Sequence, residues 1–135
     1  MTGKVFVDSN IWIYLYCESD HKHDSAVQFI SACAAGGALV VSYQVVNEVC
    51  HVLMKRGYSE HDIVHVASGI MSLCELTNFS TETIFTASNL RERYSFSYWD
   101  SMIVAAALLS GCKTLASEDM QDGLHLDNMV IMNVL

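Results

Sequence analysis

Residues 97–117 read SYWDSMIVAAALLSGCKTLAS, and they contain in order a helix start, a helix, a stop signal and a strand. Ser97 can cap a helix, the apolar run that follows it predicts a helix over 98–110, and Gly111 can end that helix. The stretch KTLAS then has the composition of a buried strand. A helix this apolar should be buried, and Asp100 in its first turn with it. The stretch predicts one helix–strand unit of an α/β domain.

The same alternation of strands and helices continues along the rest of the chain. Further strands are predicted at 4–7, 38–42, 74–80 and 129–135, and further helices at 11–16, 22–35, 43–56, 60–73 and 81–93. Strands that alternate with helices predict a parallel sheet, here of four to five strands, with helices on both faces. A chain of 135 residues has room for one such domain and one core.

The composition excludes several classes of protein. At 52% hydrophobic residues the chain is not expected to be disordered. No uncharged apolar run reaches about 18 residues, so no membrane-spanning helix is expected, and the N-terminal segment lacks the profile of a secretory signal. The five cysteines are an odd number without a CxxC motif, which indicates free thiols in a reducing compartment. We therefore expect a cytoplasmic protein.

The charge is strongly acidic, with 15 Asp and Glu against 7 Lys and Arg and a net charge of −8. Such a balance is unusual for a protein that binds nucleic acid non-specifically. It is compatible with carboxylates that serve as ligands in one place rather than as dispersed surface charges.

Two acidic residues follow predicted strands. Asp8 comes directly after VFV, and Asp119 follows the strand in TLASEDM. Each could be a turn or cap residue. Asp122, three residues further and before Gly123, is explained most simply as a turn residue.

Two more acidic residues lie on predicted helices. Glu48 is spaced three after Val45 and four before Val52, on the edge of the buried stripe of its helix. An acid there tends to be paired or functional, although a solvated position is an alternative. Asp100 stands three after Ser97, which is also the spacing of a capping box.

The four acids are harder to explain separately when they are considered together. In a parallel α/β fold the ends of strands and the starts of helices can converge at one edge of the sheet. Carboxylates that converge repel one another unless divalent cations neutralise them. Hard cations such as Mg²⁺ take oxygen ligands and commonly contact substrate phosphates, which suits hydrolysis of a phosphodiester.

Four segments together resemble the PIN-domain ribonucleases, in particular the VapC-type toxins of toxin–antitoxin pairs. They are VFVDSNIWIY, SYQVVNEV, SYWDSMIVAAAL and LASEDMQDG, in this order and nearly from end to end of the chain. Each motif is weak alone, and the third is the most specific. All four in order, at this length, are a strong signal.

The resemblance implies a three-layer α/β/α sandwich, here a single PIN-like domain over 1–135, that cleaves RNA endonucleolytically. It also implies a Mg²⁺ or Mn²⁺ site, 5′-phosphate and 3′-hydroxyl products, homodimerisation and a cognate antitoxin. The implied metal ligands and catalytic residues are Asp8, Glu48, Asp100 and Asp119, with Asp122 as a further candidate ligand and with Ser9, Asn10 and Ser117 shaping the site. The RNA substrate is not named by any motif.

The chain departs from expectation in its shortage of basic residues. The paired bases are Lys55 with Arg56 and Arg91 with Arg93, and each pair falls near the end of a predicted helix. They could grip RNA or simply complement the helix dipole.

Two other functions remain as alternatives. His61 and His65 in HDIVH have the i, i+4 spacing of a zinc helix, but Asp62 stands where a glutamate base is usual, and no third ligand is apparent. The other alternative is a PIN-fold interaction module without catalytic activity.

Overall fold

In the computed structural model, which describes residues 3–17 and 20–135, six strands form one sheet in the order β3-β2-β1-β4-β6-β5. The predicted domain also includes residues 1–2 and 18–19, which lie outside the described residues. The strands are β1 (Val5–Val7), β2 (Leu39–Ser42), β3 (Glu75–Thr77), β4 (Thr114–Ala116), β5 (His125–Leu126) and β6 (Met129–Met132). The strands β2, β1 and β4 are fully buried, which explains why they are mostly apolar, with one hydroxyl residue each in β2 (Ser42) and β4 (Thr114).

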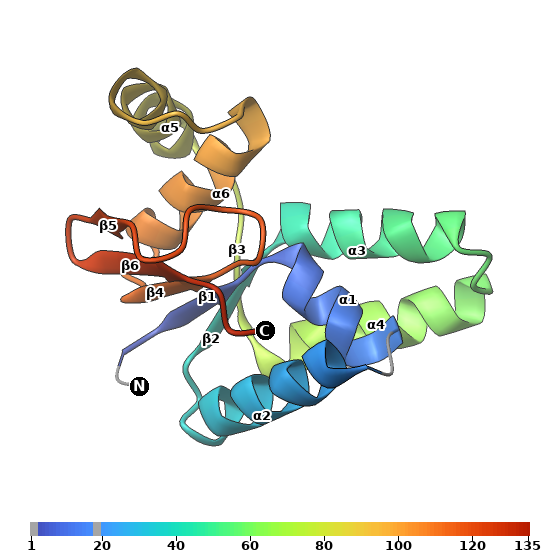
Figure 1. Cartoon of the computed structure of the whole chain (residues 1–135). Helices are drawn as coiled ribbons and strands as arrows, with labels where there is room; N and C mark the ends of the chain where they lie inside the picture. Colours follow the sequence, from blue (N-terminus) through green and yellow to red (C-terminus); the bar gives the residue numbers. More distant parts are fainter. Residues whose placement is uncertain (1–2, 18–19) are drawn as a thin grey trace.

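Six described helices cover the two faces of this sheet (Figure 1). One side holds α1 (Ser9–Cys17), α2 (His21–Ala35), α3 (Tyr43–Lys55) and α4 (Glu60–Leu73), where α1 packs against both α2 and α3, and α3 packs against α4. The other side holds α5 (Thr81–Arg93) and α6 (Tyr98–Leu109), which pack together. The predicted α/β/α sandwich is confirmed.

The local signals in the sequence place the helix ends correctly. The hydroxyls of Ser42, Ser59, Ser80 and Ser97 each accept a hydrogen bond from a backbone N–H in the first turn of α3, α4, α5 and α6, respectively. Serine at this position satisfies a donor that the helix itself leaves unpaired. The cap at Ser97 defines where α6 begins, and so it places Asp100 in the first turn of that helix.

Five of the strands, β3, β2, β1, β4 and β6, run parallel, which agrees with the prediction of a parallel sheet of four to five strands; the sixth strand, β5, was not predicted. Strand β5 has only two residues and pairs antiparallel with β6, through a turn in which Asp127 takes a φ of 50°. A strand this short carries no detectable alternation, because the side-chain period of a strand needs several residues to be recognised.

The order of the strands fixes where a ligand can bind. From β1 the chain moves to β2 and then β3 in one direction, whereas β4 lies on the other side of β1. Both β2 and β4 are parallel to β1. The change of direction leaves a crevice at the carboxyl ends of β1 and β4, where ligands of open α/β sheets bind. Asp8 and Asp119 follow these two strands.

Within the described residues, no helix combines the length and apolar character needed to cross a membrane.

Candidate active site

Asp8 forms the floor of the candidate site. It lies directly after β1, its residue is only 5% exposed, and its backbone N–H donates to the carbonyl of Ala116 at 3.0 Å. Its Oδ1 accepts from the N–H of Ser9 at 2.8 Å, and its Oδ2 accepts from the hydroxyl of Ser117 at 2.9 Å. Both oxygens are therefore held in place by neighbouring groups.

A chain of hydrogen bonds joins Asp8 to Asp119 across the sheet. Ser117, fully buried, accepts from the backbone N–H of Asp119 at 3.3 Å while it donates to Asp8. Asn10 donates from Nδ2 to Asp119 Oδ2 at 3.0 Å and accepts from the N–H of Glu118 at 3.1 Å. The residues predicted to shape the site, Ser9, Asn10 and Ser117, thus orient the two carboxylates that follow β1 and β4.

Glu48 lies on α3 and is half-buried, as its place on the edge of the buried stripe predicts. Gln44, one turn earlier, donates from Nε2 to Glu48 Oε1 at 2.9 Å. The amide oxygen of Gln44 is buried without a hydrogen-bond partner among the described residues. Gln44 was not predicted as a site residue, although its spacing of four from Glu48 was a usable signal.

Asp100 is only half-buried, so the prediction that it is buried with its helix was wrong. The apolar stretch Ser101–Ala107 is indeed buried, but the first turn of α6 stands clear of the core and leaves Trp99 58% exposed. The N–H of Asp100 donates to Ser97 Oγ at 3.2 Å, which is one half of the predicted capping box. No hydrogen bond to the Asp100 carboxylate is present within the described residues, so that carboxylate is available to a ligand.

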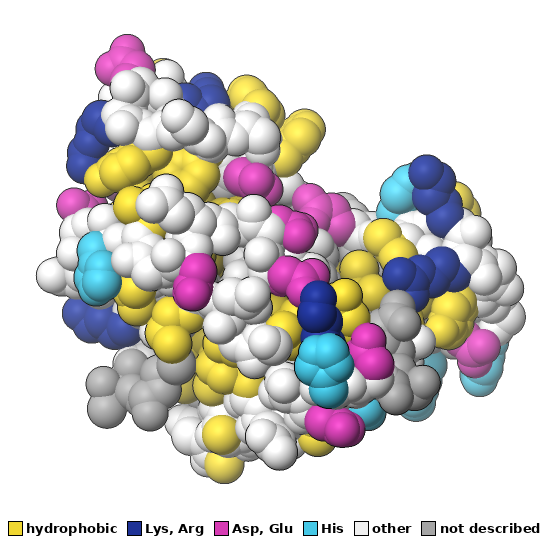
Figure 2. All heavy atoms as spheres, viewed as in Figure 1, with side chains coloured by type: hydrophobic (Ala, Val, Ile, Leu, Met, Phe, Trp, Pro, Cys, Tyr) yellow, Lys and Arg dark blue, Asp and Glu magenta, His cyan; other side chains and the backbone are white. Residues whose placement is uncertain are grey.

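Electrostatics connects three of the four carboxylates. The pKa of Asp8 is raised from 3.8 to about 6, chiefly by burial, and repulsion from Glu48 and Asp100 adds to the effect of burial. The hydrogen bonds from Ser9 and Ser117 act in the opposite direction. Figure 2 shows Asp and Glu side chains gathered along the recess between the α5–α6 side of the molecule and the α3 side.

Two cavities flank these carboxylates. Glu48 and Trp99 are among the residues that line a groove of about 490 Å³, together with Gln44 and other residues at the start of α3. Asp100 and Asp119 line a second cavity of about 350 Å³, into which the end of α5 contributes Arg93. Three of the four carboxylates, those of Glu48, Asp100 and Asp119, therefore belong to residues that line a cavity.

The remaining candidate residues lie apart from this arrangement. Asp122 is exposed, and its Oδ1 accepts a hydrogen bond from the N–H of Asn133 at 2.9 Å, a contact that holds the loop after β4 to the chain beyond β6. His61 and His65 are exposed on α4, and in residues 3–17 and 20–135 no group of three His, Cys, Asp or Glu side chains is close enough to ligate one ion. The zinc-helix alternative therefore gains no third ligand.

The donor set nevertheless fits a hard divalent cation. Asp8, Glu48, Asp100 and Asp119 offer only carboxylate oxygens, and Asp8 is buried while its neighbours repel it. A nearby cation would relieve that repulsion. Mg²⁺ commonly binds through one or two carboxylates and completes its octahedron with waters and substrate phosphate oxygens, so a compact group of three protein ligands is not required.

A sequence profile of the PIN domain matches residues 5–122, which is most of the chain. The chain belongs to the PIN domain family. This match spans Asp8, Glu48, Asp100 and Asp119, and it also includes Asp122. No curated protein matches the sequence.

Solved structures of toxins share this PIN fold at low sequence identity. The structure of VapBC2 from Rickettsia felis, bound to a DNA fragment from its promoter, matches with a TM-score of 0.74 at 19% identity, over 96% of this chain and 97% of that chain. A toxin–antitoxin complex from Klebsiella pneumoniae matches with a TM-score of 0.73 at 21% identity, over 94% and 96%. VapC20 of Mycobacterium tuberculosis, a toxin that cleaves the sarcin-ricin loop, matches with a TM-score of 0.66 at 19% identity, over 83% and 87%.

Proposed function

We propose that this PIN-domain chain is a Mg²⁺- or Mn²⁺-dependent endoribonuclease and the toxin of a toxin–antitoxin pair, acting as a single domain over 1–135. The observation that carries the proposal is the network from Asp8 through Ser117 to Asp119, with Glu48 and Asp100 close enough to raise the pKa of Asp8. The fold shared with VapC20, with VapBC2 and with a toxin–antitoxin complex supports it.

Each site residue has a role in this proposal. Asp8, Glu48, Asp100 and Asp119 would together hold one or two cations, which when bound would lower the pKa of water and stabilise charge on the phosphate. Ser117 and the N–H of Ser9 fix the two oxygens of Asp8. Asn10 fixes Asp119. The phosphodiester would be cut to 5′-phosphate and 3′-hydroxyl ends. Asp122 would keep the loop after β4 in place through the hydrogen bond that it accepts from the N–H of Asn133.

The proposed partners are RNA, a second copy of the chain and an antitoxin, in the cytoplasm. A surface for self-association is offered by the exposed apolar side chains of α5 and α6. They are Ile84, Phe85, Tyr98 and Trp99, each at least half exposed. Exposed apolar patches often mark protein interfaces.

The test is cleavage of a pool of structured and single-stranded RNAs, including a sarcin-ricin stem-loop, with Mg²⁺ or Mn²⁺ and then with EDTA. Asp100→Asn runs beside the wild type, and Asp127→Asn is the matched control. Asp127 lies in the β5–β6 turn at a positive φ that asparagine adopts readily, so the control removes one carboxylate without strain.

We expect metal-dependent cutting that Asp127→Asn retains. Asp100→Asn should lower this cutting more than about 100-fold, because loss of a metal ligand should cost more than loss of a group that only orients a ligand, which typically costs 10- to 100-fold. Equal cutting by both variants would assign the activity to a different site or a contaminant. Absence of cutting by the wild type on every RNA would favour the non-catalytic interaction module.

A further inference from the structure

The two arginines in the last turn of α5 have different surroundings. Arg91 is half-buried, its Nη1 donates to the hydroxyl of Ser101 at 2.7 Å, and its guanidinium carbon lies 4.7 Å from the centre of the Tyr98 ring. It therefore joins α5 to the first turn of α6. Arg93 is exposed and lines the 350 Å³ cavity that Asp100 and Asp119 also line.

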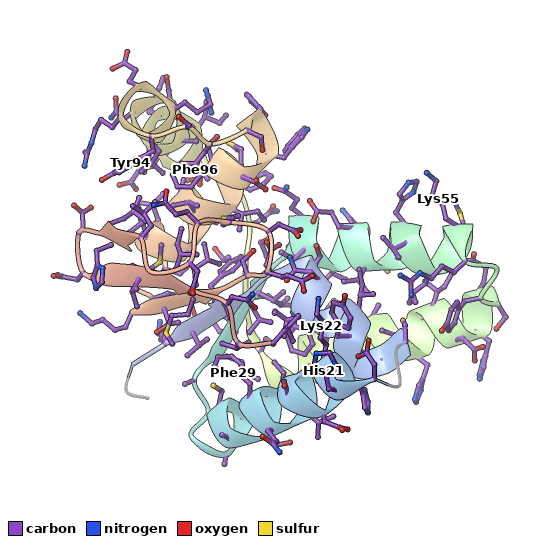
Figure 3. All side chains as sticks on the ribbon, in the orientation of Figure 1. His21, Lys22, Phe29, Lys55, Tyr94 and Phe96 are labelled. Carbon is purple, nitrogen blue, oxygen red and sulfur yellow. The ribbon has the colours of Figure 1, made fainter. Side chains whose placement is uncertain are left out.

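Arg93 keeps most of its donors available. Its Nη2 is 3.4 Å from the hydroxyl of Tyr94, and its guanidinium lies 5.4 Å from the centre of that ring. Among the described residues it forms no ion pair, although Asp100 and Asp119 line the same cavity. Figure 3 shows Tyr94, which supports the guanidinium, beside Phe96 on the α5–α6 side of the molecule.

The other basic residues are less suited to meet a substrate here. Lys55 and Arg56 stand at the C-terminal end of α3, seven and eight residues beyond Glu48. Lys22 pairs with Glu118, and Lys4 pairs with Glu75. Lys113 precedes β4 and so lies at the opposite end of the sheet from Asp119. In a chain with a net charge of −8, a cation placed directly beside the carboxylates would offset their repulsion of an approaching phosphate.

We infer that Arg93 binds a phosphate of the RNA next to the one that is cut, and so positions the strand across Asp100 and Asp119. The inference rests on the proposed function, because it names a contact for that substrate. A guanidinium suits this role: its planar set of donors matches two phosphate oxygens at once, and it stays charged at every physiological pH. Arg93 is a positioning residue, since the carboxylates and the cation would carry the chemistry.

The experiment compares the steady-state cleavage of one RNA by the wild type, Arg93→Gln and Arg93→Lys over a range of salt concentrations. Lys113→Gln controls for the loss of one positive charge, and Arg91→Gln controls for the neighbouring position. Thermal melts test whether every variant is folded. Because Arg93 is exposed, its substitution is expected to leave the protein folded.

For Arg93→Gln we expect KM to rise about tenfold at low salt with kcat nearly unchanged, as loss of one charged hydrogen-bonding contact predicts. The slope of log KM against log salt should fall by about 0.7, the value for one phosphate contact to a single strand. Arg93→Lys should give an intermediate KM, because it keeps the charge and loses the paired geometry. Arg91→Gln should lower the melting temperature without changing the salt slope.

Three results would overturn the inference while the proposed function stands. These are an unchanged KM and salt slope in Arg93→Gln, an equal rise in KM in Lys113→Gln, and a fall in kcat with KM unchanged. The last would mean that Arg93 acts on the carboxylates rather than on RNA. A wild type that cuts no RNA would instead overturn the proposed function, and the inference with it.

Discussion

The candidate site has two sides that the fold builds differently. On the strand side, Ser117 joins Asp8 to Asp119, and Asn10 holds Asp119, by hydrogen bonds of 2.9–3.3 Å. On the helix side, Glu48 is held by Gln44 alone, and the Asp100 carboxylate accepts no hydrogen bond among the described residues. The protein therefore orients the strand side in advance, whereas the helix side is free to adjust to a ligand.

The difference follows from where each pair lies in the fold. Strands β1 and β4 are buried and paired directly in register, so the residues after them are fixed relative to one another. Glu48 lies in the second turn of α3 and Asp100 in the first turn of α6, and both are only half-buried. Groups that are already oriented stabilise a transition state without having to move. We therefore expect the strand side to set most of the geometry of the site.

The largest effect that we expect on stability concerns Asp8. Because its pKa is raised from 3.8 to about 6, the metal-free folded state holds a proton that the unfolded state has lost between these values. Stability is therefore lost as the pH rises through this window, by about 3 kcal/mol for two pKa units. Above it, the ionised carboxylate remains unfavourable.

Urea unfolding in EDTA at pH 4 and at pH 7.5 measures this effect. From pH 4 to pH 7.5 the wild type should lose up to about 3 kcal/mol of its free energy of unfolding relative to Asp8→Asn, which lacks the titrating carboxyl. Added Mg²⁺ should stabilise the wild type at pH 7.5 by more than it stabilises Asp8→Asn. If the two proteins instead differed in free energy of unfolding by the same amount at both pH values, burial would not be raising the pKa of Asp8.

Ser117→Ala tests the strand side directly. The change leaves Asp8 Oδ2 and the N–H of Asp119 without their shared partner in a buried place, which should cost about 1–3 kcal/mol of stability. Groups that orient metal ligands typically contribute 10- to 100-fold to activity, so we expect kcat to fall within that range. Unchanged kcat in a folded variant would contradict the preorganisation of this side.

Ser97→Ala tests the helix side, with Ser80→Ala as its matched control. Each serine caps one of the two helices that pack together, and loss of either cap should cost about 1 kcal/mol in urea unfolding. Only Ser97 holds the turn that carries Asp100, so only Ser97→Ala should also lower kcat, by a few-fold. Equal kcat values for the two variants would mean that Asp100 is positioned without its cap.

The sequence was most informative where local rules operate. The cap at Ser97 and the apolar runs placed the described helices within a few residues, because capping and side-chain period depend on near neighbours. The convergence of Asp8 and Asp119 followed from parallel topology, which the alternation of strands and helices indicated. Strand β5 was missed because two residues carry no period.

What escaped prediction depends on contacts between distant parts of the chain. The bond between Asn10 and Asp119 joins residues 109 positions apart, and no local pattern announces it. The burial of Asp100 was overestimated, because hydropathy describes a whole helix and not how far its first turn extends beyond the sheet. Arg91 and Arg93 were indistinguishable in sequence, since both complement the end of the same helix, and only their contacts separate them.

The smallest effect that we expect is that of Gln44→Leu. The change removes one hydrogen bond to Glu48, but it also removes a buried amide oxygen that has no partner among the described residues. These two contributions oppose each other, so the free energy of unfolding should change by less than about 1 kcal/mol. Glu48 would still reach a cation, and kcat should fall less than tenfold, well short of Ser117→Ala. A loss of activity as large as that of Ser117→Ala would show that the helix side is as strictly oriented as the strand side.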